Sequence, residues 1–141
     1  MEVKVHWVQD VQFKGVSSSG HEVMMDGPPS HGGNEAGFRP MELMLVSLGG
    51  CSSFDVVSML KKGRQPVGSC VVDIKAERAD AVPAVFTAIH LHFTVTGTGL
   101  NEKQVERAVQ LSAEKYCSAS IMLGKAGVRM THSFEVRDSL L

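Results

Sequence analysis

Residues 40–62 read PMELMLVSLGGCSSFDVVSMLKK and decide the fold of this chain. Apolar residues surround this stretch on all sides of a 3.6-residue period, and Asp55 is the only charge in its middle. Pro40 suits a first helical turn, Glu42 suits its positive end, and two lysines precede Gly63 at the other end. The pattern predicts one long helix that lies inside the protein.

The same stretch is apolar enough to raise the question of a membrane span. Asp55, the glycine pair 49–50 and four serines in the interior argue against one, because polar groups are costly in lipid. We therefore expect a core helix and no membrane partner.

Short elements are expected on both sides of this helix. Period-two alternation and turn residues before it predict three strands and a long loop, at residues 2–8, 11–14, 21–25 and 26–38. The pattern after it predicts two strands joined at residues 80–83, two helices and a last strand, at residues 67–77, 85–96, 101–115, 118–123 and 128–136. Asn101 and Gln104 make a capping pair for the first of these helices. The order predicts one α+β domain over residues 1–141.

The composition excludes several classes of protein. The 141 residues carry a formal net charge of −1 without a dense basic run, which argues against nucleic acid. The alternating, charged N-terminus lacks the apolar stretch of a secretory signal. The three cysteines are widely spaced and odd in number, which does not suit a disulfide framework. We therefore expect a cytoplasmic protein.

Cys51 lies on a polar line of the long helix with Ser47, Asp55 and Ser58, at spacings of four, four and three residues. The preceding Gly49-Gly50 pair costs roughly 1 kcal/mol per glycine in a helix, which indicates close approach by another backbone or a ligand. These features fit a working thiol, and a small buried core residue is an equal alternative.

Cys117 stands where one helical pattern ends and the next begins, with Ser118 as the expected N-cap. Unpaired N–H groups of a helix N-terminus stabilise a thiolate, although simple packing is an equal alternative. Cys70 lies in an apolar strand, and we interpret it as core. His90 and His92 share a strand face without a third ligand nearby, so we expect solvated histidines, no metal and no cofactor.

Two segments resemble the OsmC/Ohr family of osmotically inducible and organic hydroperoxide resistance proteins. Residues 39–52 are similar to the stretch around that family's first active cysteine, and residues 112–118 to the stretch around its second. Residues 55–64 resemble a YhfA-like branch. The resemblance implies an OsmC-like fold in an intertwined homodimer with the long helix at its centre.

The resemblance also implies a chemistry. Cys51 would attack a hydroperoxide, and Cys117 would resolve the sulfenic acid to a disulfide that a dithiol reductant reopens. Glu42 and Arg39 are the candidates for the family's helper carboxylate and arginine. The family places its glutamate directly after the proline, where this chain has Met41, so Glu42 is turned by about 100°. A solvated loop arginine is the alternative for Arg39.

Two other functions stay open. A non-catalytic protein on the same scaffold would bind a small apolar or acyl ligand between its helices. A redox sensor would form the disulfide without turnover.

Overall fold

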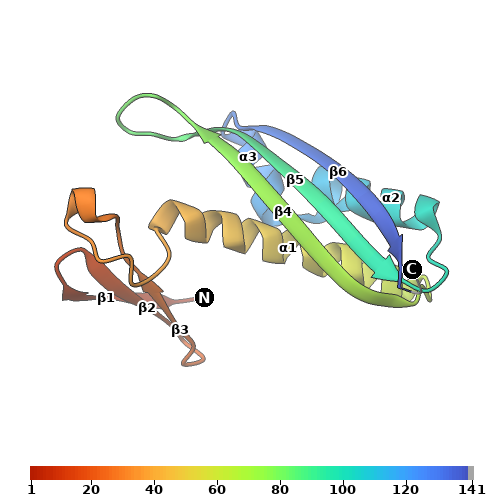
Figure 1. Cartoon of the computed structure of the whole chain (residues 1–141), viewed down its shortest axis with the longest axis horizontal. Coiled ribbons are helices and arrows are strands. Elements are labelled where there is room, and N and C mark those ends of the chain that lie inside the picture. The colour runs from red at the N-terminus through yellow and green to blue at the C-terminus, as the bar shows by residue number, and fades with distance from the viewer. Residues whose placement is uncertain (140–141) are drawn as a thin grey trace. The chain divides into compact units, whose positions relative to one another are not determined.

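The computed structural model describes residues 1–139, which fold as an α+β protein with two three-stranded sheets among them (Figure 1). The chain divides into two compact units, Met1–Val46 and Ser47–Leu141. Helix α1 (Pro40–Lys62) contributes its first residues to the first unit and the rest to the second. The predicted α+β class and the bounds of the long helix are confirmed.

The first unit contains an antiparallel meander of β1 (Val3–Gln9), β2 (Gln12–Ser17) and β3 (Glu22–Met25). The turns between these strands use Asp10, with φ of 47°, and Gly20, with φ of 87°. The three strands predicted from alternation are therefore confirmed.

The loop after β3 is organised by the buried carboxylate of Asp26. It accepts backbone N–H bonds from Gly27 at 2.7 Å, Ala36 at 3.1 Å and Asn34 at 3.2 Å. The Gly27 bond lowers the pKa of Asp26 most, burial opposes this, and the bonds from Ala36 and Asn34 lower the pKa further. One side chain thus holds a loop that also contains the short 3-10 helix η1 (Pro29–His31).

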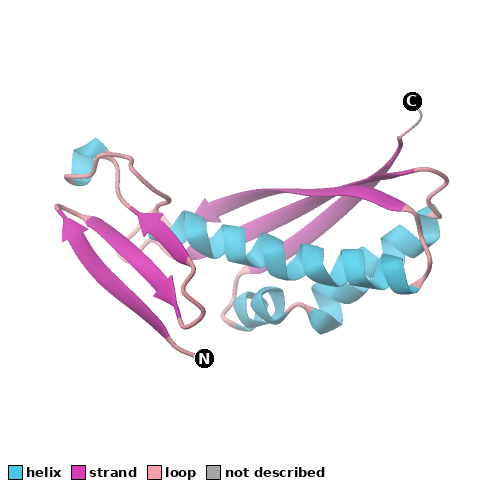
Figure 2. Cartoon of the chain, turned by 90° about the horizontal axis from the view of Figure 1, so that it is seen from below, coloured by secondary structure: helices cyan, strands magenta, loops and turns pink. Residues whose placement is uncertain are grey.

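The second unit is built on the sheet β4-β5-β6, formed by β4 (Val67–Arg78), β5 (Phe86–Gly97) and β6 (Arg129–Asp138). Strands β4 and β5 form the expected antiparallel hairpin, and β6 runs parallel to β5. Helices α1, α2 (Glu102–Leu111) and α3 (Ser118–Lys125) lie on one face of this sheet (Figure 2). The core lies beneath them, where β5 buries Ile89, Leu91, Phe93 and Val95.

The junction between α2 and α3 differs from the prediction. Asn101 caps α2 by accepting the N–H of Gln104 at 3.2 Å, as expected. The helix then stops at Leu111, and residues Ser112–Tyr116 form a π-helical turn in place of the predicted continuous helix. A π-helical turn often accompanies a functional site.

The histidines of β5 are partly exposed and are also hydrogen-bonded to β6, which was not predicted from the sequence. The two nitrogens of His90 lie 2.7 Å from Thr131 Oγ1 and 2.8 Å from Ser133 Oγ. The two nitrogens of His92 form hydrogen bonds with the same Ser133 hydroxyl at 2.7 Å and with Glu135 at 3.2 Å. Parallel pairing in register places these side chains on the same face, which the sequence of β5 alone did not indicate.

Helix α1 is not enclosed on all sides within the single chain, contrary to the prediction. Its buried residues form one stripe at Leu48, Ser52, Val56 and Leu60, whereas Phe54 is 74% exposed. By length and composition alone α1 meets the requirements of a membrane span, with 28% of its apolar window buried. The core helix of a soluble protein meets the same requirements.

Candidate active site

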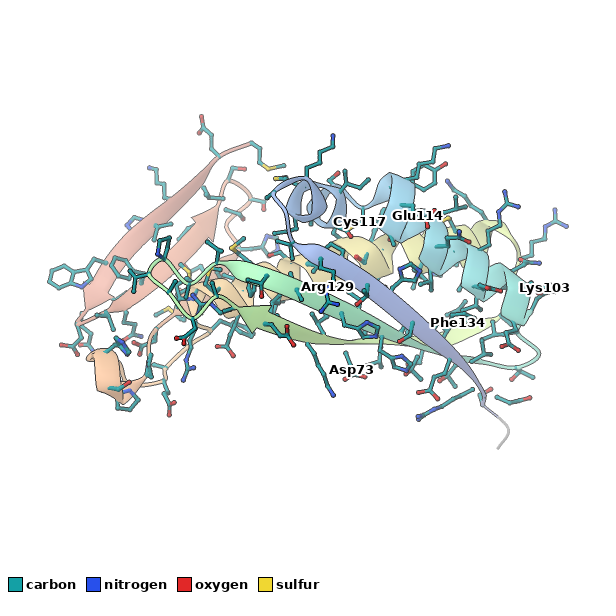
Figure 3. All side chains as sticks on the ribbon, turned by 90° about the horizontal axis from the view of Figure 1, so that it is seen from above. Asp73, Lys103, Glu114, Cys117, Arg129 and Phe134 are labelled. Atoms are coloured by element: carbon teal, nitrogen blue, oxygen red, sulfur yellow. The ribbon has the colours of Figure 1, made fainter. Side chains whose placement is uncertain are left out.

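The second unit brings the Cys51 side chain into contact with Cys117, close enough to raise the pKa of the Cys117 thiol. Cys51 comes from the middle of α1, and Cys117 comes from the residue that precedes α3. Both are free thiols. Figure 3 shows Cys117 beside the coil of α3, with Glu114 on the preceding turn. Two segments far apart in the sequence therefore supply one dithiol site.

The two thiols differ in their access to solvent. Cys51 is partly exposed, whereas Cys117 is 0% exposed. Cys51 lies on the expected polar line of α1, where Asp55 is also partly exposed. A reagent from solvent therefore meets Cys51 before Cys117.

The glycine pair before Cys51 has two different surroundings. A Cβ at Gly49 would lie 3.0 Å from Ile74 Cδ1 and 3.3 Å from Val72 Cγ1, both side chains of β4. A Cβ at Gly50 would meet nothing within 4 Å. Close approach is thus present at Gly49 alone, and strand side chains make it instead of the predicted backbone or ligand.

Cys117 is itself the N-cap of α3, so the prediction of Ser118 as the cap is wrong by one residue. Its backbone is extended, with φ of −76° and ψ of 104°, and its sulfur accepts the N–H of Ser120 at 3.4 Å. Ser118 is the first residue of the helix and is exposed. The expected contact between this thiol and a helix N-terminus is present.

A serine hydroxyl completes the surroundings of the Cys117 sulfur. Ser52 Oγ lies 3.2 Å from Cys117 Sγ, and both side chains are buried. Burial raises the pKa of the Cys117 thiol above its ordinary value, and Cys51 raises it further. The bonds from Ser52 and Ser120 act in the opposite direction. The resting Cys117 is therefore a protonated thiol at neutral pH.

The π-helical turn is fastened to α1 by Ser112. Its hydroxyl donates to Asp55 Oδ2 at 3.1 Å and lies 3.3 Å from the carbonyl oxygen of Ser52. The Ser112 carbonyl in turn accepts the backbone N–H of Cys117 at 2.9 Å. One residue thus links the backbone of the second cysteine to the helix that carries the first.

A cavity of about 160 Å³ lies between these serines and residues of β5 and β6, which share its lining. Its polar lining includes Ser52 and Ser120, which both form hydrogen bonds with the Cys117 sulfur, together with Glu114 and His132. Glu114 and His132 are also exposed, so the cavity reaches solvent there. The rest of its lining is Leu91, Phe93, Val109, Ser112, Ala113, Met130 and Thr131.

Sequence reasoning missed these serines and His132, although a signal was present. Ser52 follows Leu48 and precedes Val56 at four-residue spacing, so it is a polar side chain in an apolar stripe. His132 pairs in register with the buried Leu91 and therefore faces the helices. A polar residue within an apolar stripe is the signal that finds Ser52.

The other candidates have different surroundings. Glu42 and Arg39 are in the first unit, where Glu42 Oε1 accepts the Arg39 backbone N–H at 3.0 Å. The exposed Arg39 guanidinium forms an ion pair with Glu35 at 3.6 Å.

Cys70 is half-buried. Burial raises the pKa of its thiol, and a hydrogen bond with Ser53 acts in the opposite direction. Among residues 1–139 no group of three or more metal-ligating side chains is present.

Comparison with known proteins agrees with this fold. Residues 32–133 match the family model described as OsmC-like protein. The chain is 52% identical over 136 residues to Protein YhfA of Escherichia coli strain K12, covering 96% of this chain and 98% of that protein.

Solved structures show the same architecture. A hypothetical protein from Aquifex aeolicus superposes with a TM-score of 0.84 at 34% identity, covering 98% of this chain and 96% of that one. An organic hydroperoxide resistance protein from Legionella pneumophila, also described as a predicted redox protein, has a TM-score of 0.71 at 17% identity and 95% coverage of each chain. The similarity to the Legionella pneumophila protein is a similarity of fold.

Proposed function

Because this chain belongs to the OsmC-like protein family, in its YhfA-like branch, we propose that it is a thiol-dependent peroxidase that reduces organic hydroperoxides or hydrogen peroxide. The observation that carries the proposal is the contact between a partly exposed and a fully buried thiol, Cys51 and Cys117. The hydroperoxide resistance of a protein with the same fold supports it. A role in the stress response, in the cytoplasm, follows from the same proposal.

The reaction divides between the two cysteines. The Cys51 thiolate attacks one peroxide oxygen, the O–O bond breaks, and the other oxygen leaves as an alcohol or water after taking a proton. Cys51 is then a sulfenic acid. Cys117 sulfur attacks it, the S–O bond breaks, and water leaves as the disulfide forms. A dithiol reductant restores both thiols by two exchanges and is itself oxidised to a disulfide.

Cys51 is proposed as the attacking residue because a peroxide from solvent reaches a partly exposed sulfur first. Cys117 suits the second step, since its buried thiol is kept from the peroxide but touches Cys51. Arg39 and Glu42 are proposed as helpers that bind and orient the peroxide. For this role the Arg39–Glu35 ion pair and the hydrogen bond from the Arg39 backbone N–H to Glu42 have to be replaced by bonds to the peroxide.

We also propose that the chain acts as one domain over residues 1–141 in a homodimer. Strand β1 exposes the apolar side chains of Val3, Val5 and Trp7, at 70%, 59% and 68%, and α1 exposes Phe54. Apolar patches of this kind mark a surface that another chain covers. The exposed residues fit a second copy, as the family resemblance implies.

The ligand-binding alternative has less support. Pockets for small-molecule ligands enclose about 300–1,000 Å³. The cavity beside the serines measures about 160 Å³, so an acyl chain of useful length does not fit it. The redox-sensor alternative differs from the enzyme only in turnover, which an assay with a dithiol reductant distinguishes.

Thiol titration and intact mass test the proposal. One equivalent of an organic hydroperoxide should consume two thiols per chain and remove two hydrogens from the mass. Cys117→Ser should gain one or more oxygens, Cys51→Ser should stay unchanged, and Cys70→Ser should behave like the parent. An unchanged thiol count in the parent, or oxidation of Cys51→Ser at the parent rate, would contradict the proposed function.

A further inference from the structure

The Ser52 hydroxyl lies between the buried thiol and the cavity. It is 3.2 Å from Cys117 Sγ, and the same residue lines the cavity that Glu114 and His132 open to solvent. Ser52 is 2% exposed and Cys117 is 0% exposed. Solvent therefore reaches the neighbourhood of Cys117 through this serine.

Disulfide formation requires Cys117 to lose a proton. The thiolate is the nucleophile, but burial raises the pKa of Cys117 and keeps the resting group protonated. The proton has to leave as the sulfur attacks, and a sulfur with 0% exposure has no direct contact with bulk water. A neighbouring group that also borders the cavity can carry the proton to solvent.

Among the residues that the structure describes, the groups in contact with Cys117 Sγ differ in their capacity to carry a proton. The Ser120 contact is a backbone N–H, which donates a hydrogen bond and accepts none. Cys51 is the sulfur under attack in this step. The Ser52 hydroxyl has one donor and two acceptor sites, so it can take one proton and release another.

The cavity supplies a destination for that proton. At about 160 Å³ it has room for several water molecules, each of which occupies about 30 Å³ in the liquid. His132 in its wall carries an imidazole, which can both donate and accept hydrogen bonds to water. A polar cavity with this lining connects Ser52 to bulk solvent.

We infer that Ser52 is a catalytic residue that relays the proton of Cys117 into this cavity during disulfide formation. This inference rests on the proposed function. The Cys117 S–H proton passes to Ser52 Oγ as the hydroxyl releases its own proton to the cavity. The Cys117 sulfur bonds to the Cys51 sulfur and the S–O bond of the sulfenic acid breaks. The departing hydroxide takes up a proton from solvent, which reaches the partly exposed Cys51, and leaves as water.

Single-turnover oxidation with an organic hydroperoxide tests the relay in the parent, Ser52→Ala, Ser52→Thr and Ser53→Ala. Sulfenic acid at Cys51 is trapped with a dione probe, and disulfide is measured by intact mass after acid quench. Ser52→Ala should form the sulfenic acid at the parent rate and the disulfide about 100-fold more slowly, as expected for loss of a positioned proton-transfer group. Ser52→Thr keeps the hydroxyl and should stay near the parent rate.

The matched control is Ser53→Ala, whose side chain contacts Cys70 instead of Cys117 and should leave both phases unchanged. Disulfide formation at the parent rate in folded Ser52→Ala overturns the inference and leaves the proposed function intact. A parent that loses no thiols overturns both.

A second measurement covers a failure of Ser52→Ala to fold. In the parent, deuterium oxide should slow disulfide formation, because the relayed proton moves in that phase. Equal rates of disulfide formation in the two solvents overturn the inference.

Discussion

Ser112 donates its hydroxyl hydrogen to the Asp55 carboxylate across 3.1 Å, which joins the π-helical turn before Cys117 to the helix that carries Cys51. Ser112 is 1% exposed, so water cannot readily replace this contact. The distance between the two thiols thus depends on a residue that touches neither of them.

Replacing Ser112 with alanine should therefore lower the free energy of unfolding by about 1–2 kcal/mol, the cost of leaving a partly buried carboxylate without a donor. Urea denaturation followed by circular dichroism measures the change. Ser118→Ala is the control and should cost about 0.5 kcal/mol or less, because Ser118 is exposed and is not the N-cap. A loss near 1 kcal/mol at Ser118, as for a true N-cap, would contradict the capping by Cys117.

The two adjacent glycines should respond in opposite ways to the same change. Gly50→Ala should raise the free energy of unfolding by about 1 kcal/mol through helix propensity, since the new Cβ meets nothing within 4 Å. Gly49→Ala gains the same propensity but pushes on Ile74 and Val72, which should cancel or exceed that gain. We expect the variants to differ by about 1–2 kcal/mol in thermal or urea unfolding. Equal stabilities would show that β4 moves away freely.

Local signals predicted the elements of this fold well. The helix over residues 40–62 has the predicted bounds because its proline, glycine and charges act within a turn of each end. The meander β1-β2-β3 and the hairpin β4-β5 were visible as alternation interrupted by turn residues. The π-helical turn was not, since it depends on a bond from Ser112 to a helix distant in sequence.

The candidate site was only partly visible in the sequence. Spacing singled out Cys51 and Cys117 separately, and family resemblance paired them. Their contact depends on how α1 and α3 pack, which no local pattern encodes. Ser52 was missed because the helix was interpreted from its apolar residues alone. The position of Ser52 within the buried stripe was not considered.

A pair of charged substitutions on α1 tests the proposed homodimer. Leu48 is 0% exposed, so Leu48→Arg should destabilise the chain by about 3–5 kcal/mol through an unpaired buried charge. Phe54 is 74% exposed within the chain, so Phe54→Arg should leave the fold intact and convert a dimeric mass to a monomeric one. Light scattering and circular dichroism separate these effects. A monomeric parent, or a Phe54→Arg dimer as tight as the parent, counts against the proposed assembly.

The buried thiols should make the protein less stable at alkaline pH. Burial raises the pKa of Cys117, and likewise of Cys70, above the ordinary thiol value of 9.0. A raised folded-state pKa means that the native chain binds the proton more tightly than the unfolded chain does. Each thiol therefore contributes stability that is complete below the unfolded pKa and is lost as pH rises through the folded pKa. Urea midpoints measured in a reductant from pH 7 to pH 10.5 should fall above about pH 8.5, where unfolded thiols begin to ionise.

Two variants separate the contributions of the two thiols. The urea midpoint of Cys117→Ser should fall less steeply with pH than that of the parent, since a hydroxyl does not titrate in this range. The urea midpoint of Cys70→Ser should still show the decrease that Cys117 causes. Identical slopes in the parent and both variants would mean that neither thiol is buried in solution.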